Sequence, residues 1–434
     1  MHNENITELY ELSRRLSNTP PILPPEILNQ HVRKYFDRSD AYISVLKKYP
    51  PPRYVLESSI LRNKARKFKN AFNRIFEDTA FYFAMKSNNC PDVSKILLEE
   101  GFGLDVSSGL ELETALSLGA TDIIFSGPGK TDEELALAVK NSDAVVVLVD
   151  SFGELARLER ICAEVGRDMS IGVRLTTQPK GLWRKFGILP ERLPEFREAV
   201  RKSTRIRLKG LQFHTSWNMS PEAQANFIAN LGRTLLGMSE TFKKQLEFID
   251  IGGGYWPEQG EWLRHEGTPA GSIQKACGLD DHSPLVHYRV ESTAIECFAM
   301  KIGEVVTRHL SGIFPCRICF EPGRWIVNDA MHLFLSVMDK KADDLVITDA
   351  GTNAIGWERY EIDYCPILNL TRPALEEKTC LVLGSLCTPH DVWGGAYWGH
   401  GMEPGDLLMI PEQGAYTYSL RQTFIKPVPE TTVI

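Results

Sequence analysis

Short apolar runs alternate with amphipathic segments along most of the chain, and this alternation constrains the fold more than any other feature. The runs that we expect to form strands lie at residues 53–57, 80–85, 103–106, 122–125, 144–149, 170–175, 208–213, 248–251 and 317–320. Apolar residues recur with helical spacing between them, at 58–73, 91–100, 110–118, 132–140, 152–165, 221–243 and 292–309. Strand–helix units repeated every ~20–40 residues place their strands parallel. Seven or eight such units fit a closed (β/α)8 barrel better than an open sheet, although the count alone leaves closure unproven.

The two ends of the chain do not show this alternation of strands and helices. Residues 1–50 read as a partly helical leader, which prolines at 20, 21, 24 and 25 interrupt and prolines at 50–52 close. Beyond about residue 325 the helical periodicity fades, and turns separate short β-rich runs at 332–338, 345–348, 380–384 and 407–410. We therefore divide the chain into a leader with a first strand (1–57), an α/β barrel (58–325) and a C-terminal β-domain (326–434).

Composition excludes several classes of protein. The 434 residues carry a net charge of −7, so the clustered basic surface of a nucleic-acid binder is not expected. No run of about 18 apolar residues occurs, and the polar N-terminus lacks the apolar core of a signal peptide. The nine cysteines are dispersed, which is typical of reduced thiols in the cytoplasm. The C-x-x-C at Cys316 and Cys319 lies in an apolar run without a second pair, so we expect no metal site.

Polar residues recur at the points where the expected strands stop. They are Lys86, Asp105, residues 127–130, Arg174, His214, residues 252–254 and residues 321–324. The C-terminal ends of parallel barrel strands gather at one mouth, where reactive groups lie. So regular a pattern is less expected from packing alone.

Each of these residues also has an ordinary structural explanation. Lys86 can lose its proton in a partly dry pocket and condense with an aldehyde, or it can be an exposed lysine at a strand end. The glycines at 252–254 suit a phosphate or simply a tight turn. Glu321 and Arg324 can bind a cofactor or form a salt-bridged loop. The same two kinds of explanation hold for His214, Cys387 and Tyr416.

Taken in order, the motifs resemble those of one known family. The segments are F-A-M-K-S-N, G-L-D-V-S-S-G-L-E-L, R-K-F-G-I, F-H-T, D-I-G-G-G, E-P-G-R, D-A-G, G-S-L-C-T-P-x-D and G-A-Y. They resemble the fold-type III pyridoxal 5′-phosphate (PLP) decarboxylases, the group of diaminopimelate, ornithine and biosynthetic arginine decarboxylases. The resemblance spans roughly residues 52–425. It implies an alanine racemase-like fold, in which a (β/α)8 TIM-like barrel is joined to a β-domain built from both ends of the chain.

The resemblance also implies a role for each matching residue. Lys86 would form the internal aldimine with PLP, His214 would stack on the pyridine ring, and Glu321 would bond the pyridine nitrogen. The expected cofactor-binding set is Lys86, Asp105, Arg174, His214, Ser216, Gly253, Gly254, Glu321, Arg324 and Tyr416. Cys387 would enter from the partner subunit of a homodimer with shared active sites, and would protonate the substrate carbon after carbon dioxide leaves. The expected catalytic residues are therefore Lys86, His214 and Cys387.

The segments expected to hold the substrate depart from the family pattern. An acidic residue normally follows the cysteine and pairs with a distal amine, but Thr388 stands there. The arginine that normally follows Asp-Ala-Gly is displaced to Arg359. These two residues and Asp391 form the tentative substrate set. Trp217, Trp357, Trp393 and Trp398 are candidates either to wall a bulky group or to pack the protein.

We therefore expect a cytoplasmic PLP-dependent carboxy-lyase that acts on an amino acid or an amino-acid conjugate. Siderophore assembly or another specialised biosynthesis is the expected setting, with no nucleic-acid or membrane partner. A diaminopimelate or basic amino-acid decarboxylase is one alternative. An amino-acid racemase is a second, although racemase relatives place an arginine where Glu321 stands, and a carboxylate there favours decarboxylation. A non-catalytic regulatory homologue is the third.

Overall fold

The computed structural model describes residues 12, 20–279, 283–310, 317–356, 360 and 362–434, and it divides into two compact units. The barrel unit comprises Ser59–Glu258 and Ser292–Val327. The β-unit comprises Met1–Ser58, Gln259–Glu291 and Asn328–Ile434. Most of residues 1–19 of the expected leader, together with Cys316, Trp357 and Arg359, lie outside the described residues.

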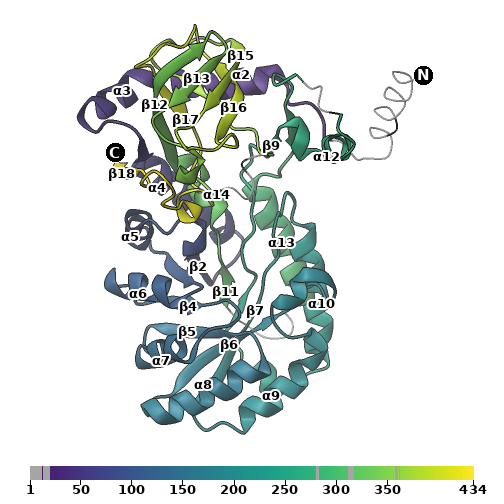
Figure 1. Cartoon of the computed structure of the whole chain (residues 1–434). Helices are drawn as coiled ribbons and strands as arrows, with labels where there is room; N and C mark the ends of the chain where they lie inside the picture. The colour runs from purple at the N-terminus through teal and green to yellow at the C-terminus, as the bar shows by residue number, and fades with distance from the viewer. Residues whose placement is uncertain (1–11, 13–19, 280–282, 311–316, 357–359, 361) are drawn as a thin grey trace. The chain divides into compact units, whose positions relative to one another are not determined.

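Eight parallel strands form a closed barrel, as the strand–helix repeats predict (Figure 1). They are β2 (Thr79–Ala84), β3 (Gly103–Val106), β4 (Ile123–Phe125), β5 (Val145–Val149), β6 (Met169–Leu175), β7 (Ile206–Phe213), β8 (Phe248–Asp250) and β11 (Arg317–Phe320). Closure comes from β11, in which Ile318 is in register with Thr79 of β2 on one side and with Ile249 of β8 on the other. The expected (β/α)8 barrel is thereby confirmed.

Helices follow the barrel strands in alternation. They are α4 (Ser58–Asn73), α5 (Pro91–Glu99), α6 (Gly109–Ser117), α7 (Asp132–Lys140), α8 (Phe152–Val165), α9 (Leu193–Arg201), α10 (Glu222–Leu236), α11 (Glu240–Lys243), α13 (Ile295–His309) and α14 (Arg324–Val327). Local chemistry fixes several starts: the Thr131 hydroxyl accepts from the Glu134 N–H in a capping box at α7. The single helix expected at 221–243 is two helices, because α10 ends before Gly237 and the Ser239 side chain caps α11. Short 3₁₀ turns lie at Met85–Ser87, Gly181–Lys185, Pro190–Arg192, His265–Gly267, Asn328–Ala330, Thr352–Ala354 and Tyr418–Leu420.

The β-unit is built on an eight-stranded mixed sheet in the order β13-β15-β16-β14-β17-β12-β1-β18. Its strands are β1 (Arg53–Leu56), β12 (Met331–Ala342), β13 (Leu345–Thr348), β14 (Leu368–Asn369), β15 (Glu377–Leu383), β16 (Val392–Trp398), β17 (Leu407–Ile410) and β18 (Glu430–Val433). Strand β1 lies between β12, to which it is antiparallel, and β18, to which it is parallel. Both ends of the described chain therefore contribute to one sheet. Helices α2 (Pro25–Phe36) and α3 (Ser39–Lys48) belong to the same unit and supply Leu28, Tyr35 and Tyr42 to its core.

An excursion from the barrel, Gln259–Glu291, belongs to the β-unit, whereas the sequence analysis assigned it to the barrel. It contains α12 (Pro269–Ala276) and the antiparallel pair β9 (Glu261–Leu263) and β10 (Tyr288–Val290). Trp262 explains the assignment, because it is buried in the β-unit core with Tyr364 and Trp398. Strands β9 and β10 have three residues each, mix polar and apolar side chains, and lie outside any longer apolar run, so no sequence pattern identifies them. No helix among the described residues is long and apolar enough to cross a membrane.

Candidate active site

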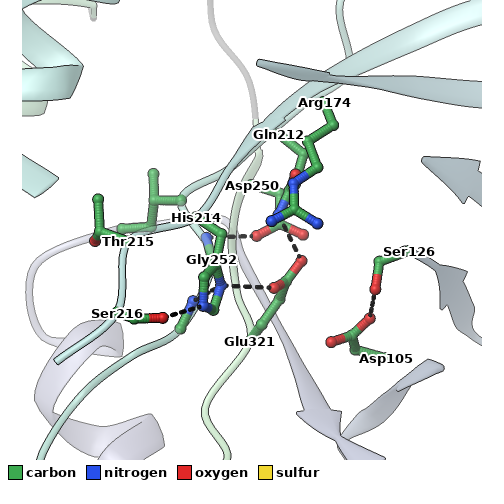
Figure 2. Close-up of polar contacts among 12 residues, drawn as sticks. Asp105, Ser126, Arg174, Gln212, His214, Thr215, Ser216, Asp250, Gly252 and Glu321 are labelled. Atoms are coloured by element: carbon green, nitrogen blue, oxygen red, sulfur yellow. Dashed lines mark hydrogen bonds and ion pairs between the residues drawn. The ribbon is translucent and has the colours of Figure 1, made fainter. Parts of the chain in front are cut away.

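Lys86 stands at the mouth of the barrel, two residues beyond the buried end of β2. The chain leaves Ala84 in a single 3₁₀ turn, Met85–Ser87, which carries Lys86 past the strand end. Its Nζ lies 2.9 Å from Oδ2 of Asp105, the fully buried carboxyl near the end of β3. Ser126 donates to the other oxygen of Asp105 at 2.5 Å (Figure 2). Burial raises the pKa of Asp105, and the Lys86 charge opposes that rise.

Glu321 follows β11 directly and is also buried at the mouth. The Gln212 side-chain amide donates to Glu321 Oε1 at 3.1 Å, and His214 Nδ1 lies 3.4 Å from Oε2 (Figure 2). Burial opposes ionisation of Glu321, but the hydrogen-bonding groups around it and the charge of Lys86 outweigh it, so the pKa is lowered. The lowered pKa favours the negatively charged form of Glu321.

The hydrogen bonds of His214 define its protonation state. The Gly253 N–H donates to Nδ1 at 3.2 Å, so Nδ1 presents a lone pair and cannot also donate to Glu321. On the opposite side of the ring, Ser216 Oγ lies 3.4 Å from Nε2. Burial lowers the pKa of His214. The contacts and the burial together favour a neutral ring with its proton on Nε2.

Asp250 is a third buried carboxyl in the same cluster. It ends β8, and its Oδ1 accepts from the Gly252 N–H at 2.8 Å. Within the described residues Oδ2 has no donor. Burial first, and the charge of Glu321 second, raise the pKa of Asp250 well above its ordinary value. The pKa values of these two neighbouring carboxyls are shifted in opposite directions, which favours the charge on Glu321 and the proton on Asp250.

The glycines after β8 form a cradle that no other residue can line. A Cβ at Gly253 would lie 2.1 Å from the Glu321 carbonyl oxygen, and one at Gly254 would lie 2.2 Å from that of Thr215. Gly254 also has φ +82°, a conformation that favours glycine. Because Gly253 donates to His214, it is Gly254 whose N–H has no acceptor among the described residues. The backbone here can approach a ligand oxygen closely.

Two arginines from the predicted site lie in the barrel unit. Arg324 opens α14, and its guanidinium lies 4.2 Å from the ring centroid of Trp256, just beyond the glycine cradle. Arg174 is buried near the end of β6, 4.4 Å from the Phe186 ring centroid, with Nε 4.0 Å from Asp150 Oδ1. The field of Arg174 contributes to the lowered pKa of His214.

The remaining predicted residues lie in the β-unit. Cys387 is exposed and Thr388 half-buried, on the turn between β15 and β16. Asp391 is buried and accepts from the N–H groups of Leu386 and Thr352 at 2.7 Å each. Its carboxylate thus fixes the turn that presents Cys387, while the direct contact with the substrate stays a prediction. Tyr416 is exposed and has φ +59°.

Three of the four candidate tryptophans lie among the described residues, and their exposure differs. Trp393 and Trp398 are buried, and Trp393 donates to Thr348 Oγ1 at 2.9 Å inside the sheet. Both are packing residues, which is the second of the two alternatives that the sequence left open for them. Trp217 is 52% exposed in the barrel unit, with φ +52° and its ring stacked toward Trp256.

Three residues of the cluster escaped the sequence analysis: Ser126, Gln212 and Asp250. Gln212 and Asp250 are polar residues inside the last apolar steps of β7 and β8, where a soluble core would otherwise be expected. That interruption is the signal that could have identified them, because a buried polar residue requires a partner.

These groups fit PLP. The part-exposed Lys86 amine suits its aldehyde, the buried Glu321 charge suits a protonated pyridine nitrogen, and the Gly254 backbone with Arg324 suits its phosphate. A metal ion does not fit as well, because no group of three or more His, Cys, Asp or Glu side chains arranged to hold one occurs among the described residues.

Comparison with known proteins agrees with the geometry. Residues 58–328 match the family described as "Pyridoxal-dependent decarboxylase, pyridoxal binding domain". The chain is 25% identical to L-glutamyl-[BtrI acyl-carrier protein] decarboxylase of Niallia circulans, covering 87% of this chain and 86% of that one. It is 27% identical to diaminopimelate decarboxylase of Methanothermobacter thermautotrophicus, covering 90% and 88%.

A third relative and a solved structure complete the comparison. The 2-[(L-alanin-3-ylcarbamoyl)methyl]-2-hydroxybutanedioate decarboxylase of Staphylococcus aureus is 25% identical, covering 78% of this chain and 83% of that one. The structure of diaminopimelate decarboxylase from Helicobacter pylori complexed with L-lysine matches with a TM-score of 0.73 at 22% identity, covering 91% and 94%. At that identity the likeness concerns the fold.

Proposed function

The chain belongs to the pyridoxal-dependent decarboxylases, and on that premise we propose that it removes the α-carboxylate of an amino acid that is presented as a conjugate. When bound, PLP supplies an aldehyde that condenses with an amine and a pyridinium ring that accepts the electron pair left by departing carbon dioxide. The barrel residues then have distinct tasks. Lys86 provides the amine for covalent attachment, and Asp105 holds it at the strand end.

Glu321 keeps the ring nitrogen protonated, since its charge is buried and steadied by Gln212. The neutral His214 ring lies beside Glu321. It offers its flat face to the pyridine ring and adds no charge that would compete with Glu321. Arg174 and Asp105 support that side of the site, while Gly254 and Arg324 receive the phosphate. With a cation in place of Glu321 the ring would be a poorer electron acceptor, so this arrangement favours decarboxylation over racemisation.

Cys387 is our candidate for returning a proton to the substrate carbon once carbon dioxide has left. It belongs to the β-unit, whereas Lys86 belongs to the barrel unit. We propose that the enzyme is a homodimer in which Cys387 of one subunit completes the site around Lys86 of the other, with Tyr416 beside the phosphate. The dispersed cysteines support a cytoplasmic location.

The substrate proposal rests on Thr388, which stands where the family normally has an acidic residue. A free diamino acid brings a distal ammonium, and a buried cation without a carboxylate partner is costly. A hydroxyl at Thr388 does not neutralise it. Two relatives act, by their names, on amino acids joined to another group, one to a carrier protein and one to a hydroxybutanedioate. A conjugate has no free distal ammonium, which suits Thr388.

Decarboxylation of a free diamino acid is the second candidate, and the diaminopimelate decarboxylases among the relatives favour it. Carbon dioxide release should be measured from diaminopimelate, lysine and ornithine, from a glutamyl-loaded acidic acyl-carrier protein, and from an amide conjugate of hydroxybutanedioate. We expect kcat/KM for a conjugate to exceed that for any free diamino acid by about 100-fold or more.

Thr388→Asp sharpens the comparison, because it restores the carboxylate that a distal ammonium needs. This variant should gain activity on lysine or ornithine, while Lys86→Ala should release no carbon dioxide from any substrate. Efficient turnover of a free diamino acid by the unaltered enzyme would refute the conjugate proposal. Loss of optical activity without carbon dioxide would identify a racemase instead.

A further inference from the structure

The loop at residues 176–187 is anchored beside the site at its base. The Thr176 N–H donates to the Ile188 carbonyl at 2.8 Å, and the Gly187 N–H donates to Asp150 at 2.9 Å. The Thr177 hydroxyl donates to the His214 carbonyl at 3.3 Å. Because β6 ends at Leu175, this loop rises from the C-terminal end of a barrel strand, the end at which Lys86 and Glu321 lie.

The tip of this loop is exposed. It carries one apolar side chain with basic side chains on either side of it in the sequence. Leu182 is 93% exposed, the highest value among the large apolar side chains that the structure describes. Lys180, Arg184 and Lys185 surround it in sequence and are exposed. None of the three has a carboxylate within ion-pair distance in the described part of the chain, although Lys185 lies 5.6 Å from the Phe186 ring centroid.

This loop differs from the other basic stretch of the barrel unit, helix α4, in which Arg62 and Arg66 both pair with Glu100. Residues 176–187 contain three cations and no acidic residue, in a chain with a net charge of −7. Most of the other exposed arginines of the barrel unit pair with acids, as Arg160 does with Asp132 and Arg192 with Glu195. An uncompensated basic loop at the rim of a site attracts anionic partners and raises their rate of encounter.

We propose that the loop at residues 176–187 is the docking surface for an acidic protein that carries the substrate amino acid on a covalent link. The inference rests on the proposed function and specifies its conjugate. A small ligand is bound by a concave site that buries most of it, whereas Leu182 projects into solvent. An exposed apolar anchor with charges around it is the arrangement found in protein–protein interfaces. Because the loop carries three cations, the partner that it binds should be negatively charged.

The test compares two substrates that share the same amino acid. One is the glutamyl-loaded acidic acyl-carrier protein, and the other is a glutamyl thioester of a short pantetheine-like thiol without the protein. The variant Lys180→Glu, Arg184→Glu, Lys185→Glu should lower kcat/KM for the loaded carrier by about tenfold or more at low salt, with a smaller loss at high salt. Turnover of the short thioester should change by less than about twofold. Leu182→Ser should lower kcat/KM for the carrier without the salt dependence.

A matched control reverses three other exposed lysines, with the same change of net charge per residue. Lys140, Lys202 and Lys244 each lie at the C-terminal end of a helix that precedes a barrel strand, at the opposite end of the barrel from the mouth. Each is exposed and has no ion pair among the described residues. Lys140→Glu, Lys202→Glu, Lys244→Glu should leave both substrates unaffected.

Three results would overturn the docking proposal. Unchanged turnover of the loaded carrier by the loop variant would leave the proposed function intact and remove the loop from it. Equal losses on both substrates would show that the loop serves the chemistry rather than docking. A changed mass by light scattering would show that the loop contacts a second copy of the chain. Failure of the proposed function is distinguishable, because the unaltered enzyme would then turn over neither conjugate.

Discussion

Replacing Asp250 by asparagine tests the proton count of the buried cluster directly. Asparagine has the same shape, its oxygen can still accept from the Gly252 N–H, and its amide can still donate toward Glu321. If Asp250 holds a proton, the substitution preserves every contact and removes only the ability to titrate. Asp250→Ala instead leaves the Gly252 N–H without its partner, which costs about 1–3 kcal/mol for a buried group.

The sign of the pH dependence follows from the raised pKa of Asp250. At pH values above 3.8, which is the ordinary pKa of an aspartate, the unfolded chain releases this proton while the folded protein keeps it. The folded state then binds more protons than the unfolded state, so Asp250 makes the protein less stable as pH rises, by up to about 1.4 kcal/mol per pH unit. The loss continues until the pH reaches the folded pKa. Asp250→Asn removes this loss of stability. As pH rises, the variant should therefore become steadily more stable than the unaltered protein.

Urea unfolding of cofactor-free protein at pH values from about 4 to about 8 measures the difference. Asp92→Asn is the control, because Asp92 is exposed at the start of α5. Infrared absorption of a protonated carboxyl at neutral pH, present in the parent and absent from Asp250→Asn, is an independent measurement. A stability difference that stays constant with pH, together with no such band, would show that Asp250 is ionised and that the division of charge with Glu321 is wrong.

Four further predictions concern the site. Borohydride reduction should leave a pyridoxyl group on the Lys86 peptide by mass spectrometry, and a label on another lysine would contradict the assignment. Glu321→Gln should slow carbon dioxide release by about 100-fold or more while PLP binding, measured by absorbance titration, weakens much less; full activity with PLP bound would exclude its role. Mixed Lys86→Ala and Cys387→Ala proteins should regain activity through one hybrid site, and no recovery despite proven subunit exchange would place the site within one chain. Gly253→Ala, whose Cβ would lie 2.1 Å from the Glu321 carbonyl, should lower the free energy of urea unfolding by about 1–3 kcal/mol, and unchanged stability would show that the cradle yields easily.

The barrel could be predicted because its strands carry their own signal. Strand β11 begins and ends where its apolar run does, and α7 does so because a capping box marks its start. The β-unit gave weaker signals. Strand β12 continues four residues beyond the expected end at residue 338, through an edge where Lys340 pairs with Val346. Exposed polar residues at a sheet edge show no alternation, so only the pairing itself identifies them as strand.

In the site, the positions of the residues could be predicted from the sequence, but their protonation states could not. Lys86, Asp105, His214 and Glu321 lie together because each follows or ends a barrel strand, and that is visible in a sequence. Their protonation states are not. The tautomer of His214 depends on a donor 39 residues away, the Gly253 N–H, which only the closed barrel brings within 3.2 Å.

The charges around Glu321 bear on why a decarboxylase would need so many buried acids. Three carboxyls ionised in one buried cluster would repel each other strongly, and Lys86 compensates only one of them. A proton on Asp250 removes one charge without removing the hydrogen bond to Gly252. We propose that this leaves a single uncompensated charge, on Glu321, beside the position of the ring nitrogen. The pyridinium would supply its missing partner, so that binding PLP and completing the charge balance of the barrel become the same event.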